Sequence, residues 1–374
     1  MIITLTRTKK TALKRLVNQI LSIKSPKLRF LAKVIGTIVA AFPASKYGPL
    51  YYRCLEYDKS SALKENKGDY EAHSQLSDGS KQELLWWRLN IDSMYHWISP
   101  PLIHSVMHCD ASAEGWGTDF LGQKAGGGWH PEEYDLHINP KELLAIYYAI
   151  KTFVEQLRHT HLKVFSDNTT AVGCITNMGS SKSSVCNRIT KEIWELCIKY
   201  GVWLTCAHIP GIHNVEADTE SRRNYEDAEW MLNPRIFHHA CKVLPFHPDL
   251  DCFASRLNSQ LAAYVSYRPD PFCTYVDAFT LTWKDFHPYL FPPFSLLPRV
   301  LQKAKIERVE AMIVAPFWPT QPWFTMLRQL LTVDIVIQPH ATNLILPNKP
   351  HKTHPLASQL HLIIGVLSGE NTSV

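Results

Sequence analysis

Two apolar, strand-like runs in the middle of the sequence each end on an aspartate. The run HSVMHCD at residues 104–110 ends on Asp110, and LKVFSD at residues 162–167 ends on Asp167. Glu142 lies near the start of the strongest helical pattern in the chain, and Asp218 lies in a later, short helical pattern. If the two strands are adjacent and parallel, both aspartates lie at one end of a sheet. A helix packed on that sheet can then present Glu142 beside them.

Carboxylates gathered at one place repel each other unless they share protons or bind a cation. Oxygen ligands at this density favour a hard divalent ion, Mg²⁺ or Mn²⁺. Two such ions about 3.5–4 Å apart can clamp a phosphodiester for in-line displacement, one beside the attacking water and one beside the leaving oxygen. The residue types therefore predict a metal site with phosphodiester-hydrolysing chemistry, and its expected ligands are Asp110, Glu142, Asp167 and Asp218.

The elements that must position these acids alternate between strand and helix patterns. Pro140 suits the first turn of the strongest helix, and Gly201 suits the end of a later one. The order predicts a mixed α/β sheet with helices on both faces. The predicted strands are 104–112, 115–121, 125–130, 162–167 and 202–211, and the predicted helices are 138–157, 168–179, 184–201 and 214–222.

The four acids and their surroundings resemble the ribonuclease H family. The resemblance is carried by HCDASAEGWGTDF (108–120), NPKELLAI (139–146), VFSDNTTAV (164–172) and HIPGIHNVEADTESR (208–222). It implies a mixed five-stranded sheet with flanking helices and catalytic roles for the four acids. It also implies a mobile histidine near the last acid, for which we favour His208 over His213. The implied activity is metal-dependent hydrolysis of the RNA strand of an RNA–DNA hybrid.

A wider resemblance extends from about Leu31 to Gln338. LAKVIGTIVAAFPASKYGPLYYR (31–53) and FASRLNSQ (253–260) look like the polyprotein of DIRS-like tyrosine-recombinase retrotransposons. In that polyprotein a reverse transcriptase precedes the ribonuclease H and a methyltransferase-like region follows it. The implied domains are a basic, helical thumb/connection-like remnant (1–103), a ribonuclease H-like domain (104–224), an α/β methyltransferase-like domain (225–345) and a tail (346–374). The chain contains no Tyr-x-Asp-Asp polymerase signature, so a separate reverse-transcriptase palm region is an expected partner.

The C-terminal part resembles phage-type adenine-N6 methyltransferases. DLDCFASRLNSQ (249–260) and FPPF (291–294) carry this resemblance. It implies that Asp251 holds S-adenosylmethionine and that Pro292, Pro293 and Phe294 receive the flipped adenine. The position that carries an acid or amide in that family is Phe291 here, which cannot accept a hydrogen bond from the amine. The residues therefore argue against methyl transfer.

Composition places the chain among globular proteins, with 45% hydrophobic and 20% charged residues over 374 positions. The net charge is +5, but residues 1–53 hold eleven Lys or Arg and no acid. Such a stretch suits a nucleic acid partner, although a solvated basic face has the same composition. The nine cysteines form no Cys-x-x-Cys pair, and the most apolar early stretch is too short to span a bilayer. We expect no membrane partner and a location in the nucleus or cytoplasm.

Three functions remain open on the sequence. The first is a retroelement-derived ribonuclease H acting on RNA–DNA hybrids. The second is a catalytically inactive remnant that only binds nucleic acid, including DNA, through its basic charge. The third is a DNA adenine-N6 methyltransferase that uses S-adenosylmethionine.

Overall fold

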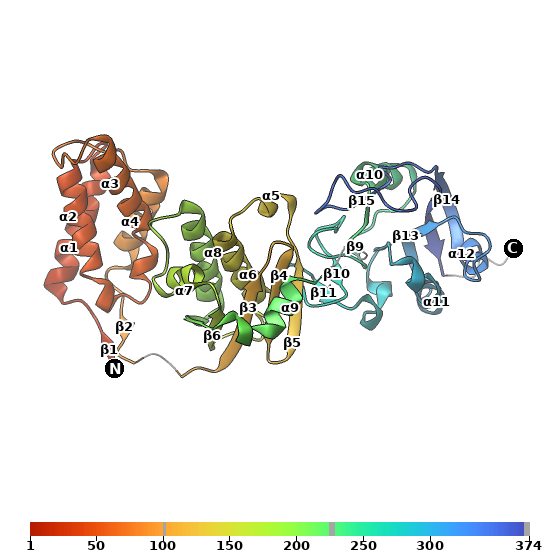
Figure 1. The fold of residues 1–374 in the computed structure, drawn as a ribbon, viewed down its shortest axis with the longest axis horizontal. Coiled ribbons are helices and arrows are strands. Elements are labelled where there is room, and N and C mark those ends of the chain that lie inside the picture. Colours follow the sequence, from red (N-terminus) through yellow and green to blue (C-terminus); the bar gives the residue numbers. More distant parts are fainter. Residues whose placement is uncertain (100–101, 224–228, 370–374) are drawn as a thin grey trace. The chain divides into compact units, whose positions relative to one another are not determined.

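The structure is a computed structural model that describes residues 1–99, 102–223 and 229–369 (Figure 1). Its contacts group into two units. The first comprises Met1–His108, Glu142–Tyr147 and Val154–Asn214, and the second comprises Cys109–Lys141, Tyr148–Phe153 and Val215–Val374. Strand β3 (Ser105–Ala111) and helix α6 (Ile138–Thr152) contribute residues to both units, so each is a continuous element shared by them.

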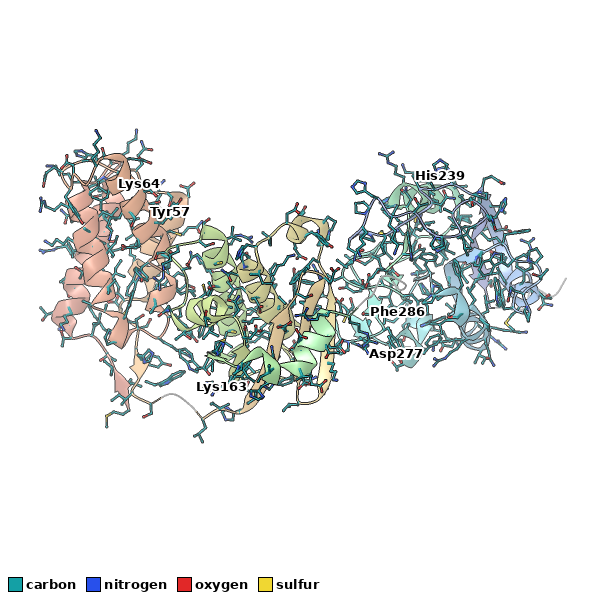
Figure 2. All side chains as sticks on the ribbon, viewed as in Figure 1. Tyr57, Lys64, Lys163, His239, Asp277 and Phe286 are labelled. Atoms are coloured by element: carbon teal, nitrogen blue, oxygen red, sulfur yellow. The ribbon has the colours of Figure 1, made fainter. Side chains whose placement is uncertain are left out.

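The N-terminal part is helical, as the resemblance implies (Figure 1). Thr6 caps the first helix by accepting from the Lys9 amide, and Ser77 caps the fourth by accepting from the Ser80 amide. Tyr57 and Lys64 lie on the third helix (Figure 2). The helices are α1 (Arg7–Ser22), α2 (Leu28–Val39), α3 (Arg53–Glu65) and α4 (Asp78–Asn90), with 3₁₀ turns at Phe42–Ala44 and Gly48–Leu50 and a two-residue pair of strands, β1 (Ile2–Ile3) and β2 (His96–Trp97). Their apolar faces share a core that includes Leu13, Val17, Leu31, Val34, Leu84 and Trp87.

The middle of the chain forms a five-stranded sheet in the order β5-β4-β3-β6-β7. Strand β4 pairs antiparallel with β5, whereas β3, β6 and β7 run parallel to one another. The sheet is therefore mixed, and its elements follow the predicted order. They are β3 (Ser105–Ala111), β4 (Gly115–Phe120), β5 (Gln123–Gly128), α5 (Pro131–Tyr134), α6 (Ile138–Thr152), β6 (His161–Ser166), α7 (Thr169–Thr176), α8 (Ser184–Tyr200), β7 (Trp203–His208), a 3₁₀ turn (Gly211–His213) and α9 (Val215–Ser221).

Local sequence explains the ends of these elements. Pro140 lies in the first turn of α6, and Gly201 ends α8 with a positive φ of 71°, which glycine adopts without strain. Asn168 caps α7 by accepting from the Ala171 amide at 2.9 Å. Helix α9 packs on β4 and β5, and α7 packs on β6 and β7.

The C-terminal part holds a second five-stranded sheet, in the order β14-β16-β13-β12-β9. Strands β9, β12 and β13 are parallel, and β16 is antiparallel to both of its neighbours. The elements are β8 (Met231–Leu232), α10 (Pro234–Val243), β9 (Leu250–Asp251), β10 (Val265–Ser266), β11 (Tyr275–Val276), β12 (Pro288–Leu290), α11 (Leu297–Glu307), β13 (Glu310–Pro316), α12 (Phe324–Leu330), β14 (Leu331–Ile337), β15 (Leu344–Ile345) and β16 (Leu362–Ser368), with short 3₁₀ turns at Ala278–Thr280, Trp283–Asp285 and Phe294–Leu296.

Both faces of this second sheet are covered. Alternate residues of β13 enter two different cores, because successive side chains of a strand point to opposite faces. Ala311 and Ile313 pack with residues of α11 and α12, and Met312 and Val314 pack with Phe237 and Ala240 of α10. The C-terminal part is therefore an α/β sandwich of three layers.

The tail predicted for residues 346–374 is wrong for part of its length. Leu362–Ser368 form β16, which lies between β13 and β14 in the sheet. The run LIIGVLS is buried on both faces, so it lacks the apolar–polar alternation by which a half-exposed strand is recognised.

Within the described residues, no helix has the length and apolar character needed to cross a bilayer.

Candidate metal centre

Asp110 and Asp167 are brought together by two neighbouring parallel strands. The register pairs Ser105 of β3 with Leu162 of β6 and His108 with Phe165. Continued by two residues, the same register places Asp110 level with Asp167. Both acids therefore lie at the carboxyl ends of adjacent strands, as the sequence predicts.

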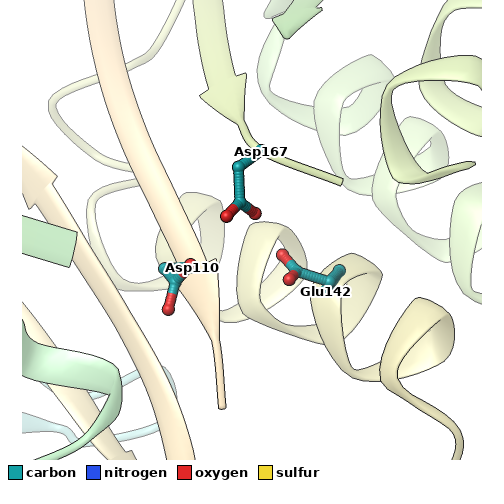
Figure 3. Close-up of side chains that lie close together, drawn as sticks. All are labelled: Asp110, Glu142 and Asp167. Carbon is teal, nitrogen blue, oxygen red and sulfur yellow. The ribbon is translucent and has the colours of Figure 1, made fainter. Parts of the chain in front are cut away.

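Glu142 completes the cluster from the second turn of α6. One carboxylate oxygen from each of Asp110, Glu142 and Asp167 lies within 4.8 Å of the others. Figure 3 shows the three carboxylates converging from β3, α6 and the loop after β6. Asp110 is 4% exposed and Glu142 is 3% exposed, whereas Asp167 is half-buried.

Two serines that the sequence analysis did not single out contact the buried acids. Ser221 Oγ donates to Asp110 Oδ2 at 2.6 Å, and Ser166 Oγ donates to Glu142 Oε2 at 3.4 Å. Ser166 immediately precedes Asp167, so the sequence alone could have indicated that it lies near the site. Ser221 lies three residues after Asp218, on a helix whose contact partner the sequence does not specify.

The donor set fits a hard divalent cation. Three carboxylates offer oxygen ligands only, which is the ligand type that Mg²⁺ and Mn²⁺ bind. Negative charges held this close in a largely buried site need a compensating cation or a shared proton. The arrangement can therefore hold a metal ion at the edge of the sheet, with the exposed side of Asp167 as an approach for a phosphodiester.

Asp218, the fourth predicted ligand, is outside this group of three. It lies on α9, and its Oδ1 accepts a hydrogen bond from Arg222 Nε at 2.7 Å, with 40% of the Asp218 side chain exposed. His208 is the exposed last residue of β7 and is paired in register with Ser166, the residue before Asp167. The structure thus brings three of the acids together, leaves Asp218 in an ion pair, and places His208 at the same end of the sheet.

The residues predicted to bind S-adenosylmethionine and adenine lie in the C-terminal part. Asp251 is 2% exposed, and its carboxylate accepts from the backbone amides of Phe253 and Gln260 at 3.3 and 2.9 Å. Burial raises the pKa of Asp251 to about 7, although these two hydrogen bonds lower it. Pro293 and Asp277, the latter labelled in Figure 2, help to line a cavity of about 470 Å³.

The flanking residues Pro292 and Phe294 lie in the turn after β12. Pro292 is buried, and the Phe294 ring packs edge-on against Trp318 at 5.4 Å between ring centroids.

Among known proteins, the chain is similar to solved structures. No family model and no curated protein matches the chain. Ribonuclease H1 from Halobacterium salinarum NRC-1 is 15% identical, with a TM-score of 0.26, over 31% of this chain and 92% of that chain. LC11-RNase H1 in complex with an RNA/DNA hybrid is 16% identical, with a TM-score of 0.26, over 31% and 93% of the two chains. The foamy viral protease-reverse transcriptase in complex with an RNA/DNA hybrid is 14% identical, with a TM-score of 0.22, over 61% and 31%.

Two features decide the fold of the middle of the chain. An antiparallel hairpin lies next to three parallel strands, and helix α6 connects β5 to β6. This strand order is the one that the resemblance to the ribonuclease H family predicts for the middle of the chain. The predicted mixed five-stranded sheet with flanking helices is confirmed, and the three converging acids come from its first strand, its first long helix and the loop after its fourth strand. The thumb-like and methyltransferase-like assignments on either side of it stay predictions.

Proposed function

We propose that this chain is a metal-dependent nuclease that hydrolyses the RNA strand of RNA–DNA hybrids. The observation that supports it most directly is the convergence of Asp110, Glu142 and Asp167 within 4.8 Å. A structural role for this group is a poor alternative, because three clustered carboxylates destabilise a fold unless something compensates their charge.

The three acids have different proposed roles, which follow from how deeply each is buried. Asp110 and Glu142 are buried and fixed by hydrogen bonds from Ser221 and Ser166, so they hold the site in one geometry. Asp167 is more accessible and would hold a divalent cation on the side from which the scissile phosphate can approach. When bound, divalent cations supply an activated water and a counter-charge for the leaving oxygen. His208, exposed at the end of β7, is our candidate for the mobile histidine that the sequence resemblance implies.

The substrate class is inferred from charge and from the resemblance in the sequence. Lysines and arginines of residues 1–53 would contact the phosphates, and contacts to 2′-hydroxyls would select the RNA strand. We further propose that the chain derives from a DIRS-like retrotransposon polyprotein, in which a separate reverse-transcriptase palm supplies the hybrid.

The test is cleavage of an RNA–DNA hybrid by the full chain with Mg²⁺ or Mn²⁺. We expect Asp110→Asn and Asp167→Asn each to lower the rate by at least about 100-fold, since changes to residues around metal ligands alone cost 10–100-fold. Omission of the metal should abolish cleavage in the same way.

Asp119→Asn is the matched control, because Asp119 lies on β4 of the same sheet and outside the cluster. It should cleave as the wild type does. Cleavage by Asp110→Asn preparations at the wild-type rate would indicate a contaminating nuclease and remove the proposal.

The inactive, nucleic-acid-binding remnant predicts a different result from the same preparations. It would bind hybrid with strong salt dependence and show no metal-dependent cleavage. The cluster of carboxylates is the observation that favours the nuclease over it.

A cavity lined by Trp116 of β4, by Gly126–Gly128 of β5 and by residues of the C-terminal part motivates a second candidate, binding of a small molecule such as S-adenosylmethionine. Its volume of about 470 Å³ is in the range of small-molecule sites, and Phe253 and Asp277 line it. Of the four residues predicted to bind S-adenosylmethionine and adenine, Pro293 lines this cavity, whereas Asp251 is buried and its carboxylate accepts from two backbone amides. Phe291 offers the amine no acceptor, which argues against adenine methylation. Calorimetric titration with S-adenosylmethionine tests binding, and transfer of a labelled methyl group to DNA tests the third function; we expect no incorporation above a control without enzyme.

A further inference from the structure

Ser221 is the side chain by which α9 reaches the metal centre. Its Oγ lies 2.6 Å from Asp110 Oδ2 and 2.9 Å from the Asp218 carbonyl oxygen. The Asp218 carbonyl oxygen can only accept a hydrogen bond, and so can the Asp110 carboxylate when it is ionised, whereas a serine hydroxyl has one proton to give. The shorter contact to the charged group is the stronger, so the proton points mainly at Asp110.

The position of Ser221 is fixed by the packing of α9 on the sheet. Ser221 is 1% exposed, and Ser112 Oγ donates to its carbonyl oxygen at 2.7 Å. A Cβ added at Gly117 of β4 would lie 2.4 Å from the Ser221 amide nitrogen, so the helix backbone rests directly on this glycine. The hydroxyl is therefore held at Asp110 by backbone contacts rather than by its own rotamer alone.

We propose that Ser221 is a positioning residue that orients the Asp110 carboxylate for metal binding. By holding Oδ2, the hydroxyl restricts rotation of the carboxylate, and this presents Asp110 toward the oxygens of Glu142 and Asp167. The inference rests on the proposed function, because it requires a metal at these three acids. It also gives α9 a role that does not depend on Asp218, whose carboxylate is paired with Arg222.

The test is direct Mn²⁺ binding to the full chain, measured by calorimetry and by the loss of the free Mn²⁺ electron-spin signal. We expect Ser221→Ala to weaken binding at this centre by about ten-fold, the scale of losing a hydrogen bond to a metal ligand. Saturating Mn²⁺ should restore most of the cleavage rate, and the Michaelis constant for hybrid should stay near that of the wild type.

Thr219→Ala is the matched control. Thr219 lies on the same helix, is exposed, and donates to the Val215 carbonyl oxygen at 2.8 Å, so its loss removes a hydroxyl from α9 without touching Asp110. Ser221→Cys is a second variant that keeps a small side chain but supplies only a weak donor, in case Ser221→Ala fails to fold. It should also weaken Mn²⁺ binding.

The outcomes separate this inference from the nuclease proposal. Wild-type affinity in both Ser221 variants would overturn the role of Ser221 and leave the nuclease standing. Equal weakening in Thr219→Ala would point to a general disturbance of α9 and would also overturn it. A wild-type chain that neither binds Mn²⁺ nor cleaves hybrid would remove both proposals.

Discussion

Glu229 lies in the C-terminal part with 5% of its surface exposed, and its Oε2 accepts a hydrogen bond from Ser255 Oγ at 2.5 Å. Burial raises the pKa of Glu229 to about 7, while the Ser255 hydrogen bond lowers it and the nearby Asp270 raises it further. Folding therefore favours the protonated form of this residue. The pKa of Asp251 is raised in the same direction and for the same cause.

Glu229→Gln should flatten the dependence of stability on pH. Between the unfolded pKa near 4.5 and the folded pKa of about 7, the folded chain binds more protons than the unfolded chain, so stability falls as pH rises through this window. The full contribution of Glu229 is about 3 kcal/mol. At pH 8 the variant should thus be more stable than the wild type, as measured by urea unfolding at pH 5 and pH 8.

Asp251 ionises with the same sign, so part of the slope should remain in the Glu229 variant. Glu310→Gln, which changes an exposed carboxylate on β13, is the control and should leave the slope unchanged. A variant that loses stability relative to the wild type as pH rises would contradict the assignment.

At the scale of elements, the contact between α9 and β4 decides how Ser221 reaches the three clustered acids. An added Cβ at Gly117 would lie 2.3 Å from the Ala217 carbonyl oxygen and 2.4 Å from the Ser221 amide nitrogen, and these are backbone atoms that cannot rotate away. The glycine therefore allows a helix to lie closer to the sheet than any other residue would.

Gly117→Ala should push α9 away from β4. We expect a loss of about 1–3 kcal/mol in stability, the usual cost of overpacking, and weaker Mn²⁺ binding because Ser221 moves with the helix. Thermal unfolding and Mn²⁺ titration measure the two effects.

Gly173→Ala is the matched control with the opposite sign. Gly173 lies inside α7, and a Cβ there would meet nothing within 4 Å. Alanine should stabilise the helix by about 0.5–1 kcal/mol. Equal behaviour of the two variants would refute the close-packing argument.

At the scale of the whole molecule, the basic residues of the segment 1–53 differ in whether an acid or a carbonyl oxygen already binds them. Lys14 pairs with Asp92 at 2.5 Å, and Lys10 Nζ donates to the Asp92 carbonyl oxygen at 2.6 Å. Arg7 and Arg15 on α1 are exposed and line a shallow hollow with Thr8, Thr11 and Ala12. These two arginines are the better candidates for phosphate contacts.

Replacing both Arg7 and Arg15 by Gln should weaken hybrid binding and reduce its salt dependence. Each lost phosphate contact lowers the slope of log K against log salt by about 0.9, so the double variant should lose about 2. Fluorescence anisotropy between 50 and 200 mM salt measures the slope.

Lys14→Gln/Lys81→Gln removes the same charge from two lysines of the helical part that are already paired with Asp92 and Asp78. Its slope should stay closer to that of the wild type. An equal reduction in both double variants would mean that only net charge matters.

The sequence by itself determined the elements of the mixed sheet in the middle of the chain and three of the acids that converge at its edge. These elements follow from local signals, namely the strand and helix periods, Pro140 and Gly201. The acids follow from geometry, because residues at the carboxyl ends of adjacent parallel strands lie at the same edge of the sheet. Strand β16 was missed because a strand buried on both faces carries no alternation.

Only the tertiary structure decided which groups surround these acids. Ser221 and Asp110 are 111 positions apart, and their contact depends on the fit of α9 against Gly117. Arg256 of the FASRLNSQ motif donates to both carboxylate oxygens of Glu133 at 3.0 Å, a pairing across 123 positions. Such contacts follow from packing between elements far apart in the chain, and local periodicity contains no information about them.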